Sequence, residues 1–200
     1  MLVNKVNLEI ERFASKDSTR PLQGVQVTGE YTEATDGKKL VRVSLPCHEA
    51  ADFPHIEGVD PAAAASGILP KDVAKATAKR LPKRNAIPII QNAAVSTDDK
   101  GAFQVATTDL SAPSVTSSRP IDGTWPNTDQ ILKQPEPSLV IGFNGVLLAE
   151  VLKWMGTNAS GLNNMVKLSF TTADSPVKLS AVTKDGQEIT GLVMPLRLKD

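Results

Sequence analysis

The spacing of apolar side chains predicts short strands over the first quarter of the chain. Polar and apolar residues alternate through NKVNLEIERF at 4–13, as in a half-buried strand, although the charged residues at its end also suit a helix. The stretches 22–29, 31–37 and 38–46 are predicted as further strands, separated by turns that contain glycine and aspartate. The segment 47–66 has no period and is interrupted by prolines, so we expect a long loop there.

Two predicted helices stand in the same order with respect to their neighbouring strands. One helix is predicted over 71–81, where a proline ends it, and another over 144–156, with Asn144 as its N-cap. Short strands precede them at 67–70 and 138–143. Three strands follow each helix, at 87–96, 101–108 and 113–121 in the first case and at 165–172, 176–186 and 188–198 in the second.

The order strand–helix–strand–strand–strand therefore occurs twice, at 67–121 and 138–198. Residues 1–46 look like a third copy whose helix is short or missing. Two such units can pair their sheets and place both helices on one side. We therefore predict an α+β fold of repeated βαβββ units, with a region of two repeats at 1–133 and a single repeat at 134–200.

The composition excludes several classes of protein. Lysine and arginine number 22, as do aspartate and glutamate, so a globally basic nucleic-acid binder is excluded, whereas a protein with one basic face is not. Cys47 is the one cysteine, which rules out an internal disulfide and suits a reducing cytoplasm. We expect no cleavable signal sequence and no membrane partner, because no apolar run approaches the roughly 20 residues that span a bilayer.

The helix predicted over 71–81 carries a concentration of positive charge. Lys71, Lys75 and Lys79 recur every four residues and share one face, and Asp72 opposes them. This face is either simply solvated or attracts the phosphates of a nucleic acid without reading its sequence. The candidate DNA-binding residues are Lys71, Lys75, Lys79, Arg80, Lys83, Arg84 and, as a weaker candidate on the helix at 144–156, Lys153.

Other constellations of reactive side chains are weak. Cys47, His48, Asp52 and His55 lie in one loop, but their spacing fits no standard zinc pattern. Because both histidines of the chain lie there, a Ser–His–Asp triad has little to build on, and no glycine-rich phosphate loop occurs. We expect no catalytic residues, no metal and no cofactor.

Four motifs of the chain resemble segments of one protein family. FASKDSTRPLQGVQV…ATDGKKL is similar to the middle domain of the bacterial DNA polymerase III β sliding clamp family, where a Thr-Arg-Pro segment, a strand and an Ala-Thr-Asp-Gly turn occur in this order. SSRPIDGTWPNTDQIL resembles its Arg-x-(Ile/Val)-Asp-Gly-x-(Phe)-Pro segment, with Trp125 in place of the usual phenylalanine. IGFNGVLLAEVLKWM is similar to its Phe-Asn-x-x-Tyr-Leu helix entry, and LVMPLRL to its C-terminal Val-Met-Pro-Met-Arg-Leu.

The resemblance implies the DNA-clamp fold, with antiparallel sheets outside and helices on the inner face of a ring. A full bacterial clamp has three domains of two repeats each, and its rings contain twelve repeats. This chain shows no counterpart of the first domain and skips the first repeat of the last, so it resembles a compact clamp of a phage or mobile element, or a fragment. Three repeats per chain would need four chains to complete such a ring.

The resemblance also implies a peptide-binding pocket between the middle and last domains, into which polymerases and loader subunits insert a short motif. Leucine, isoleucine and the adaptable methionine suit a groove for apolar anchors. The alternative is that these residues are simply core. The implied peptide-binding residues are Leu22, Thr35, Gly37, Lys38, Lys39, Leu40, Pro126, Gln130, Ile131, Leu192, Met194, Pro195, Leu196 and Arg197.

Two functions are consistent with this sequence. The first is a processivity factor without catalytic activity, which encircles double-stranded DNA as a homo-oligomeric ring. Its partners would be DNA of any sequence, a replicative DNA polymerase and clamp-loader-type proteins. The second is a clamp-like peptide-binding module that never encircles DNA. Trp125 either stacks on a ligand or, as we prefer, packs between domains.

Overall fold

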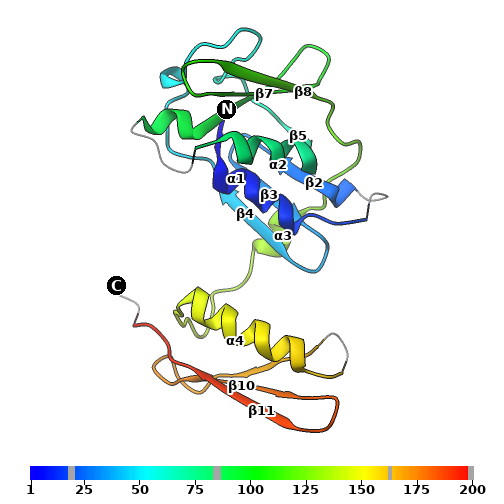
Figure 1. Cartoon of the computed structure of the whole chain (residues 1–200), viewed down its shortest axis with the longest axis vertical. Helices are drawn as coiled ribbons and strands as arrows, with labels where there is room; N and C mark the ends of the chain where they lie inside the picture. Colours follow the sequence, from blue (N-terminus) through cyan, green and yellow to red (C-terminus); the bar gives the residue numbers. More distant parts are fainter. Residues whose placement is uncertain (18–20, 83–86, 162–163, 198–200) are drawn as a thin grey trace. The chain divides into compact units, whose positions relative to one another are not determined.

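The computed structural model describes residues 1–17, 21–82, 87–161 and 164–197. The chain divides into two compact units, Met1–Asn127 (unit 1) and Thr128–Asp200 (unit 2). Figure 1 follows the chain through both.

Unit 1 contains the strand–helix–strand–strand–strand order twice. The first repeat comprises β1 (Leu2–Asn4), α1 (Lys5–Glu9) with the 3₁₀ turn η1 (Ile10–Phe13), η2 (Pro21–Gln23), β2 (Gly24–Val27), β3 (Tyr31–Thr35) and β4 (Leu40–Ser44). The second repeat comprises β5 (Gly67–Pro70), α2 (Lys71–Arg80), η4 (Pro88–Gln91), β6 (Asn92–Thr97), β7 (Phe103–Thr108) and β8 (Pro113–Ser118).

The two repeats of unit 1 exchange their first strands. One antiparallel sheet has the order β1-β6-β7-β8 and the other β4-β3-β2-β5, so each repeat contributes one strand to the sheet of the other. The register pairs Asn4 with Asn92 and Pro70 with Gly24. In both cases the last residue before the helix of one repeat lies opposite the first residue of the strand that follows the helix of the other repeat. The helices α1 and α2 pack against each other (Figure 1).

The strand predicted at 4–13 is wrong beyond its first residue, because a helix starts at Lys5. The Asn4 side-chain oxygen accepts from the backbone N–H groups of Val6 (2.9 Å) and Asn7 (3.2 Å), while the Asn7 side chain accepts from the N–H of Asn4 (3.1 Å). This reciprocal cap satisfies donors that a helix start would leave unpaired. Asn7 is also buried, and its amide nitrogen donates to Thr32 Oγ1 and Ser44 O. The alternation of polar and apolar residues at 4–13 predicted a strand here because it placed the polar Asn7 in the solvent.

A single core joins both sheets and both helices of unit 1. It includes Val3 of β1, Leu8 of α1, Leu69 of β5, Ala74 of α2 and Phe103 of β7, all of which are at most 1% exposed. The predicted loop at 47–66 contains a 3₁₀ turn, η3 (Ala50–Asp52). It packs its apolar residues Phe53, Ile56 and Val59 into a second cluster with Leu2, Ala94 and Ala106.

Unit 2 holds one helix on a three-stranded antiparallel sheet of order β11-β10-β9. Its elements are α3 (Thr128–Leu132), α4 (Gly145–Asn158), β9 (Lys167–Ser169), β10 (Val177–Val182) and β11 (Glu188–Val193). Met155 of α4 packs with Leu179 and Val193 of the sheet. A Cβ placed on Gly191 would lie 3.2 Å from Met155 Sδ and from Val151 Cγ1, so the absence of a side chain there permits the close approach of α4.

The strand predicted at 138–143 is present only as an isolated antiparallel bridge between Gly142 and Leu196. Among the described residues of unit 2, no further strand pairs with this segment. The repeated βαβββ order and the α+β class are nevertheless confirmed.

Candidate functional site

The basic residues predicted on α2 have different surroundings. Lys75 and Lys79 are exposed. Lys71 is half-buried, with Nζ 3.8 Å from Glu11 Oε2 of the sister repeat. Arg80 donates from Nη1 to Ser114 Oγ (3.1 Å) and Thr116 Oγ1 (3.0 Å) on β8. Lys75 and Lys79 are therefore the best placed of the described α2 cations to contact a phosphate.

The remaining predicted DNA-binding residues lie elsewhere. Lys153 is exposed on α4 of unit 2. Lys83 and Arg84 lie outside the described residues.

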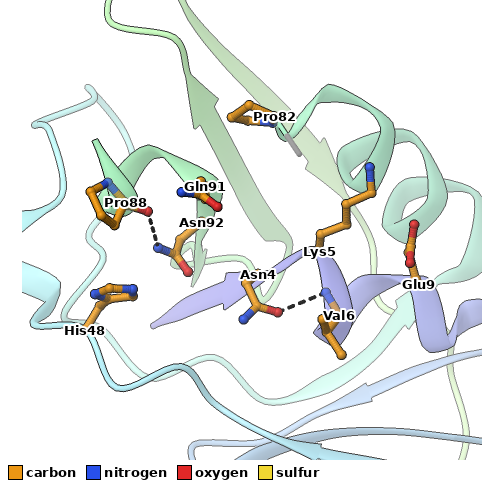
Figure 2. A pocket seen from close by; sticks show the side chains of 9 residues that line it. All are labelled: Asn4, Lys5, Val6, Glu9, His48, Pro82, Pro88, Gln91 and Asn92. Carbon is orange, nitrogen blue, oxygen red and sulfur yellow. Dashed lines mark hydrogen bonds between the residues drawn. The ribbon is translucent and has the colours of Figure 1, made fainter. Parts of the chain in front are cut away.

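The sequence interpretation missed Lys5, because its helix was predicted as a strand. Lys5 lines a hollow of about 310 Å³ together with Glu9 and His48, and Pro82, Pro88, Gln91 and Asn92 also line it. In Figure 2 the side chains of Lys5 and Glu9 extend from α1 on the same side. The asparagine pair that caps α1 was the signal that would have revealed this helix. The helix α1 carries one lysine and one glutamate, Lys5 and Glu9, whereas α2 carries four cations against Asp72.

The turn that carries the Ala-Thr-Asp-Gly motif is rigidly built from its own side chains. Gly37 has φ +86°, and its N–H donates to Thr35 Oγ1 (3.0 Å). Asp36 accepts from the N–H groups of Lys38 and Lys39 and from the ammonium of Lys39. The hydrogen bond from the Lys39 ammonium, followed by the backbone bond from Lys38, lowers the pKa of Asp36 to about 2. The turn thus orients Lys39 toward Asp36, and both Lys38 and Lys39 are exposed.

The segment that carries Trp125 is anchored on β3 of the same unit. Trp125 Nε1 donates to Glu33 Oε1 (2.7 Å), and Arg42 Nε donates to Glu33 Oε2 (2.6 Å). Glu33 is fully buried, and these two charge-assisted hydrogen bonds offset the cost of burying its carboxylate. The Arg42 guanidinium also lies 3.7 Å from the centre of the Tyr31 ring. Trp125 therefore has a defined partner within unit 1.

Three predicted segments of unit 1 meet at one end of the sheet β4-β3-β2-β5. A Cβ on Gly123, which has φ +139°, would lie 2.6 Å from Pro21 Cβ, so the Trp125 segment contacts the residue before Leu22. Because β2 and β3 are antiparallel, Leu22 before β2 and the 35–40 turn after β3 lie at the same end. Leu22 and Leu40 are half-buried, and Pro126 is exposed.

The predicted peptide-binding residues of unit 2 form an exposed apolar group. Leu192, Met194 and Leu196 are 66%, 66% and 55% exposed, which argues against a purely core role for the last strand. Val193, which faces α4, is buried, so Leu192 lies on the opposite face of the sheet.

Beyond β11 the chain is held against the 138–143 segment. Leu196 N donates to Gly142 O (2.8 Å), with half-buried Pro195 before it. Leu196 and Arg197 line a cavity of about 310 Å³ with Val140, Ile141, Gly142, Ala173 and Asp174. Gln130 and Ile131 are exposed on α3.

The side chains of the loop at 47–66 give no support for a metal site. Within the described residues, no group of three or more His, Cys, Asp or Glu side chains is arranged to hold an ion. Nor does any described helix have the length and apolar character that a membrane span requires.

The comparisons with solved structures define the class of this fold. The chain is similar to the DNA polymerase III β chain of Streptococcus pneumoniae TIGR4 (TM-score 0.70, 16% identity, 98% of this chain and 49% of that one). It is also similar to the Bacillus subtilis sliding clamp (0.65, 19%, 98% and 48%) and to a Pseudomonas aeruginosa clamp bound to griselimycin (0.68, 17%, 98% and 49%).

The chain therefore has the fold of the bacterial DNA polymerase III β sliding clamps, as the four motifs predicted. It spans about half the length of the clamps that it matches. No protein-family model matches the sequence, and no curated protein is significantly similar to it.

Proposed function

We propose that this protein is a sliding clamp without enzymatic activity, which encircles duplex DNA as a homo-oligomer and tethers a replicative polymerase and loader-type proteins. The observation that carries the proposal is the match of 98% of the chain to solved clamps, at TM-scores of 0.65–0.70 for the three named above. The exposed cations of α2 supply a face for phosphates, which is independent of base sequence.

The peptide-binding part of the proposal rests on the exposed apolar group of unit 2. Leu192, Met194 and Leu196 present three apolar side chains within five residues, and a partner's apolar anchor would remove them from water. The 35–40 turn and Leu22 of unit 1, together with Gln130 and Ile131, remain predicted members of the same binding surface.

The DNA-binding part is tested by reversing two charges on α2. Lys75→Glu with Lys79→Glu should weaken retention on nicked circular duplex DNA and reduce the slope of log affinity against log salt by about two per chain, since each phosphate contact contributes about 0.9. Lys100→Glu with Lys184→Glu is the matched control, because both lysines are exposed in hairpin turns. Equal retention and equal slopes for the two double variants would refute a DNA-facing role of α2.

A clamp-like module that binds peptides without encircling DNA is the second candidate. The observation that favours it is the exposed apolar group of unit 2, which needs no ring closure to bind a peptide. It predicts that the protein binds a clamp-binding peptide with unchanged affinity after Lys75→Glu with Lys79→Glu, and that it is not retained on circular DNA.

A further inference from the structure

Exposed apolar side chains concentrate in unit 2. Of the eighteen exposed large hydrophobic residues in the described part of the chain, fourteen belong to this unit, although it is the smaller one. Monomeric proteins rarely leave so much apolar surface on so small a unit. A comparison with unit 1 explains why part of this apolar surface is exposed.

The single repeat of unit 2 corresponds in detail to the second repeat of unit 1. Ile121 N donates to Ile68 O (2.9 Å), and Leu196 N donates to Gly142 O (2.8 Å). Each acceptor lies two residues before the N-cap of its helix, which is Pro70 or Asn144. Each donor follows a proline. The segment Ile141–Phe143 is therefore the equivalent of β5, and β9 is the equivalent of β6.

The equivalent segments differ in what covers their second edge. The far edge of β5 pairs with β2 of the sister repeat, and β6 pairs in turn with β1. In unit 2, β9 pairs only with β10 among the described residues, and Ile141–Phe143 forms only the bridge to Leu196. Because strand carbonyls alternate in direction, the backbone groups of Ile141 and Phe143 point to the edge opposite this bridge. Unpaired strand edges of this kind are templates for strand addition.

The side chains at these edges are buried in unit 1 and exposed in unit 2. The equivalence of Ile121 and Leu196 aligns Ser118 of β8 with Val193 of β11, and the strand pairings then align Ser96 with Ser169. Val95 therefore corresponds to Leu168, and Asn92 to Met165. Val95 and Asn92 are 0% and 1% exposed, whereas Leu168 and Met165 are 37% and 70% exposed. The difference is the surface that a sister repeat covers.

We propose that a second copy of this chain supplies the sister repeat. The segment Ile141–Phe143 of one copy pairs with β9 of the other, and the reverse pairing completes a symmetric dimer of the kind in which the same surface meets itself. The register of unit 1 places Asn144 opposite Met165, Phe143 opposite Val166, and Gly142 opposite Lys167 of the partner copy.

The helix surface of unit 2 suits the same arrangement. In unit 1, Lys71 at the first position of α2 reaches Glu11 of the sister repeat, next to α1. The equivalent first position of α4 is Gly145, and Ala149 follows one turn later; both are exposed. Two α4 helices can therefore approach each other closely without displacing large side chains.

The inference leads to a defined assembly but does not depend on DNA binding. A dimer of this type contains six repeats in three two-repeat units. Under the sliding-clamp proposal, two such dimers would supply the twelve repeats of a ring. Because its test needs no DNA, failure of this inference and failure of the proposed function are distinguishable.

The first test is the mass of the full chain in solution, by gel filtration with light scattering at micromolar concentration. We expect an even number of 21.3 kDa chains, two or four. Leu168→Lys should raise the dimer dissociation constant by about 100-fold or more, since the symmetric interface carries the change twice. The matched control is Val182→Lys, at an exposed side chain (48%) on β10 away from this edge, and it should leave the dimer intact. Met165→Lys is a second edge variant, and circular dichroism checks that each variant folds.

The second test is the register. In a Cys47→Ser background, chains with Gly142→Cys mixed with chains carrying Lys167→Cys should form a disulfide between chains, because directly opposed residues lie within about 5.5 Å. Chains with Ser169→Cys, two residues out of register, should cross-link at least about tenfold more slowly to Gly142→Cys. A monomeric wild-type protein, or a dimer that survives both edge variants with no cross-link at this register, would overturn the inference.

Discussion

Replacing Trp125 by phenylalanine isolates one hydrogen bond that holds its segment on β3. The substitution retains an aromatic ring at the half-buried position and removes only the indole N–H that donates to Glu33 Oε1. It also restores the residue that the resembling family uses there. Intuition from the family would therefore predict a neutral change.

The structure predicts a loss of stability instead. Glu33 is 0% exposed, and its second oxygen is already bound by Arg42 at 2.6 Å. A hydrogen bond to a charged group contributes about 1.5–3 kcal/mol, and leaving a buried acceptor unsatisfied costs a similar amount. We expect Trp125→Phe to lower the free energy of opening of β3 by about 2 kcal/mol. In a Glu33→Gln background the lost bond is neutral, so the same change should cost about 1 kcal/mol.

The assay is native-state hydrogen exchange of peptides that cover β3 and β4. The chain has two tryptophans, so in Trp125→Phe the fluorescence of Trp154 reports only on unit 2 and serves as the internal control. Its urea midpoint should not move. A change below about 0.3 kcal/mol in β3 exchange, or an equal cost in both backgrounds, would refute the account of this network.

Three further substitutions test other parts of the structure. Met194→Ala should weaken binding of a clamp-binding peptide by about tenfold or more with unchanged retention on DNA, measured by fluorescence anisotropy; unchanged peptide binding would leave the tail as a simple strand end. In an NMR pH titration the Asp36 carboxyl should have a midpoint near pH 2. Because its pKa is lowered in the folded protein, its stabilisation of the turn is fully present above its ordinary pKa of 3.8 and is lost as the pH falls through about 2. Lys39→Gln should raise this midpoint, and a wild-type midpoint near 3.8 would be inconsistent with the turn described above. Gly191→Val should destabilise unit 2 by about 1–3 kcal/mol in urea because it displaces α4, whereas Thr190→Val on the other face should change it by less than about 0.5 kcal/mol; equal effects would exclude this packing.

The parts of the fold that the sequence predicted are those with strong local signals. Lysines recur every four residues on α2, and α4 begins after an Asn144 cap that accepts from the N–H groups of Val146 and Leu147. The turn at Asp36 and Gly37 has its own hydrogen-bonding chemistry. The helix α1 was missed because the alternation of polar and apolar residues was given more weight than its asparagine cap. The partners of the buried Asn7, which are Thr32 on β3 and Val43 O on β4, are visible only in the fold. The bond from Trp125 to Glu33 spans 92 positions, so it too is visible only in the fold.

The strand predicted at 138–143 shows a different limit of sequence interpretation. Its apolar pattern is typical of a strand, but a strand also needs a partner edge. Among the described residues of the chain, Gly142 has only Leu196 as its bridge partner. The basic residues of α2 were likewise predicted, whereas the contacts of Lys71 with Glu11 and of Arg80 with β8 depend on the tertiary structure.

The central claim, that this protein encircles DNA, is tested most directly by the topology of the DNA. The protein is assembled on a nicked circular duplex, isolated by gel filtration in moderate salt, and divided into two samples, one of which is cut once with a restriction enzyme. The account predicts that the protein stays on the circle and leaves the linear DNA through its ends. Equal retention on circular and linear DNA, or retention on neither, would contradict it.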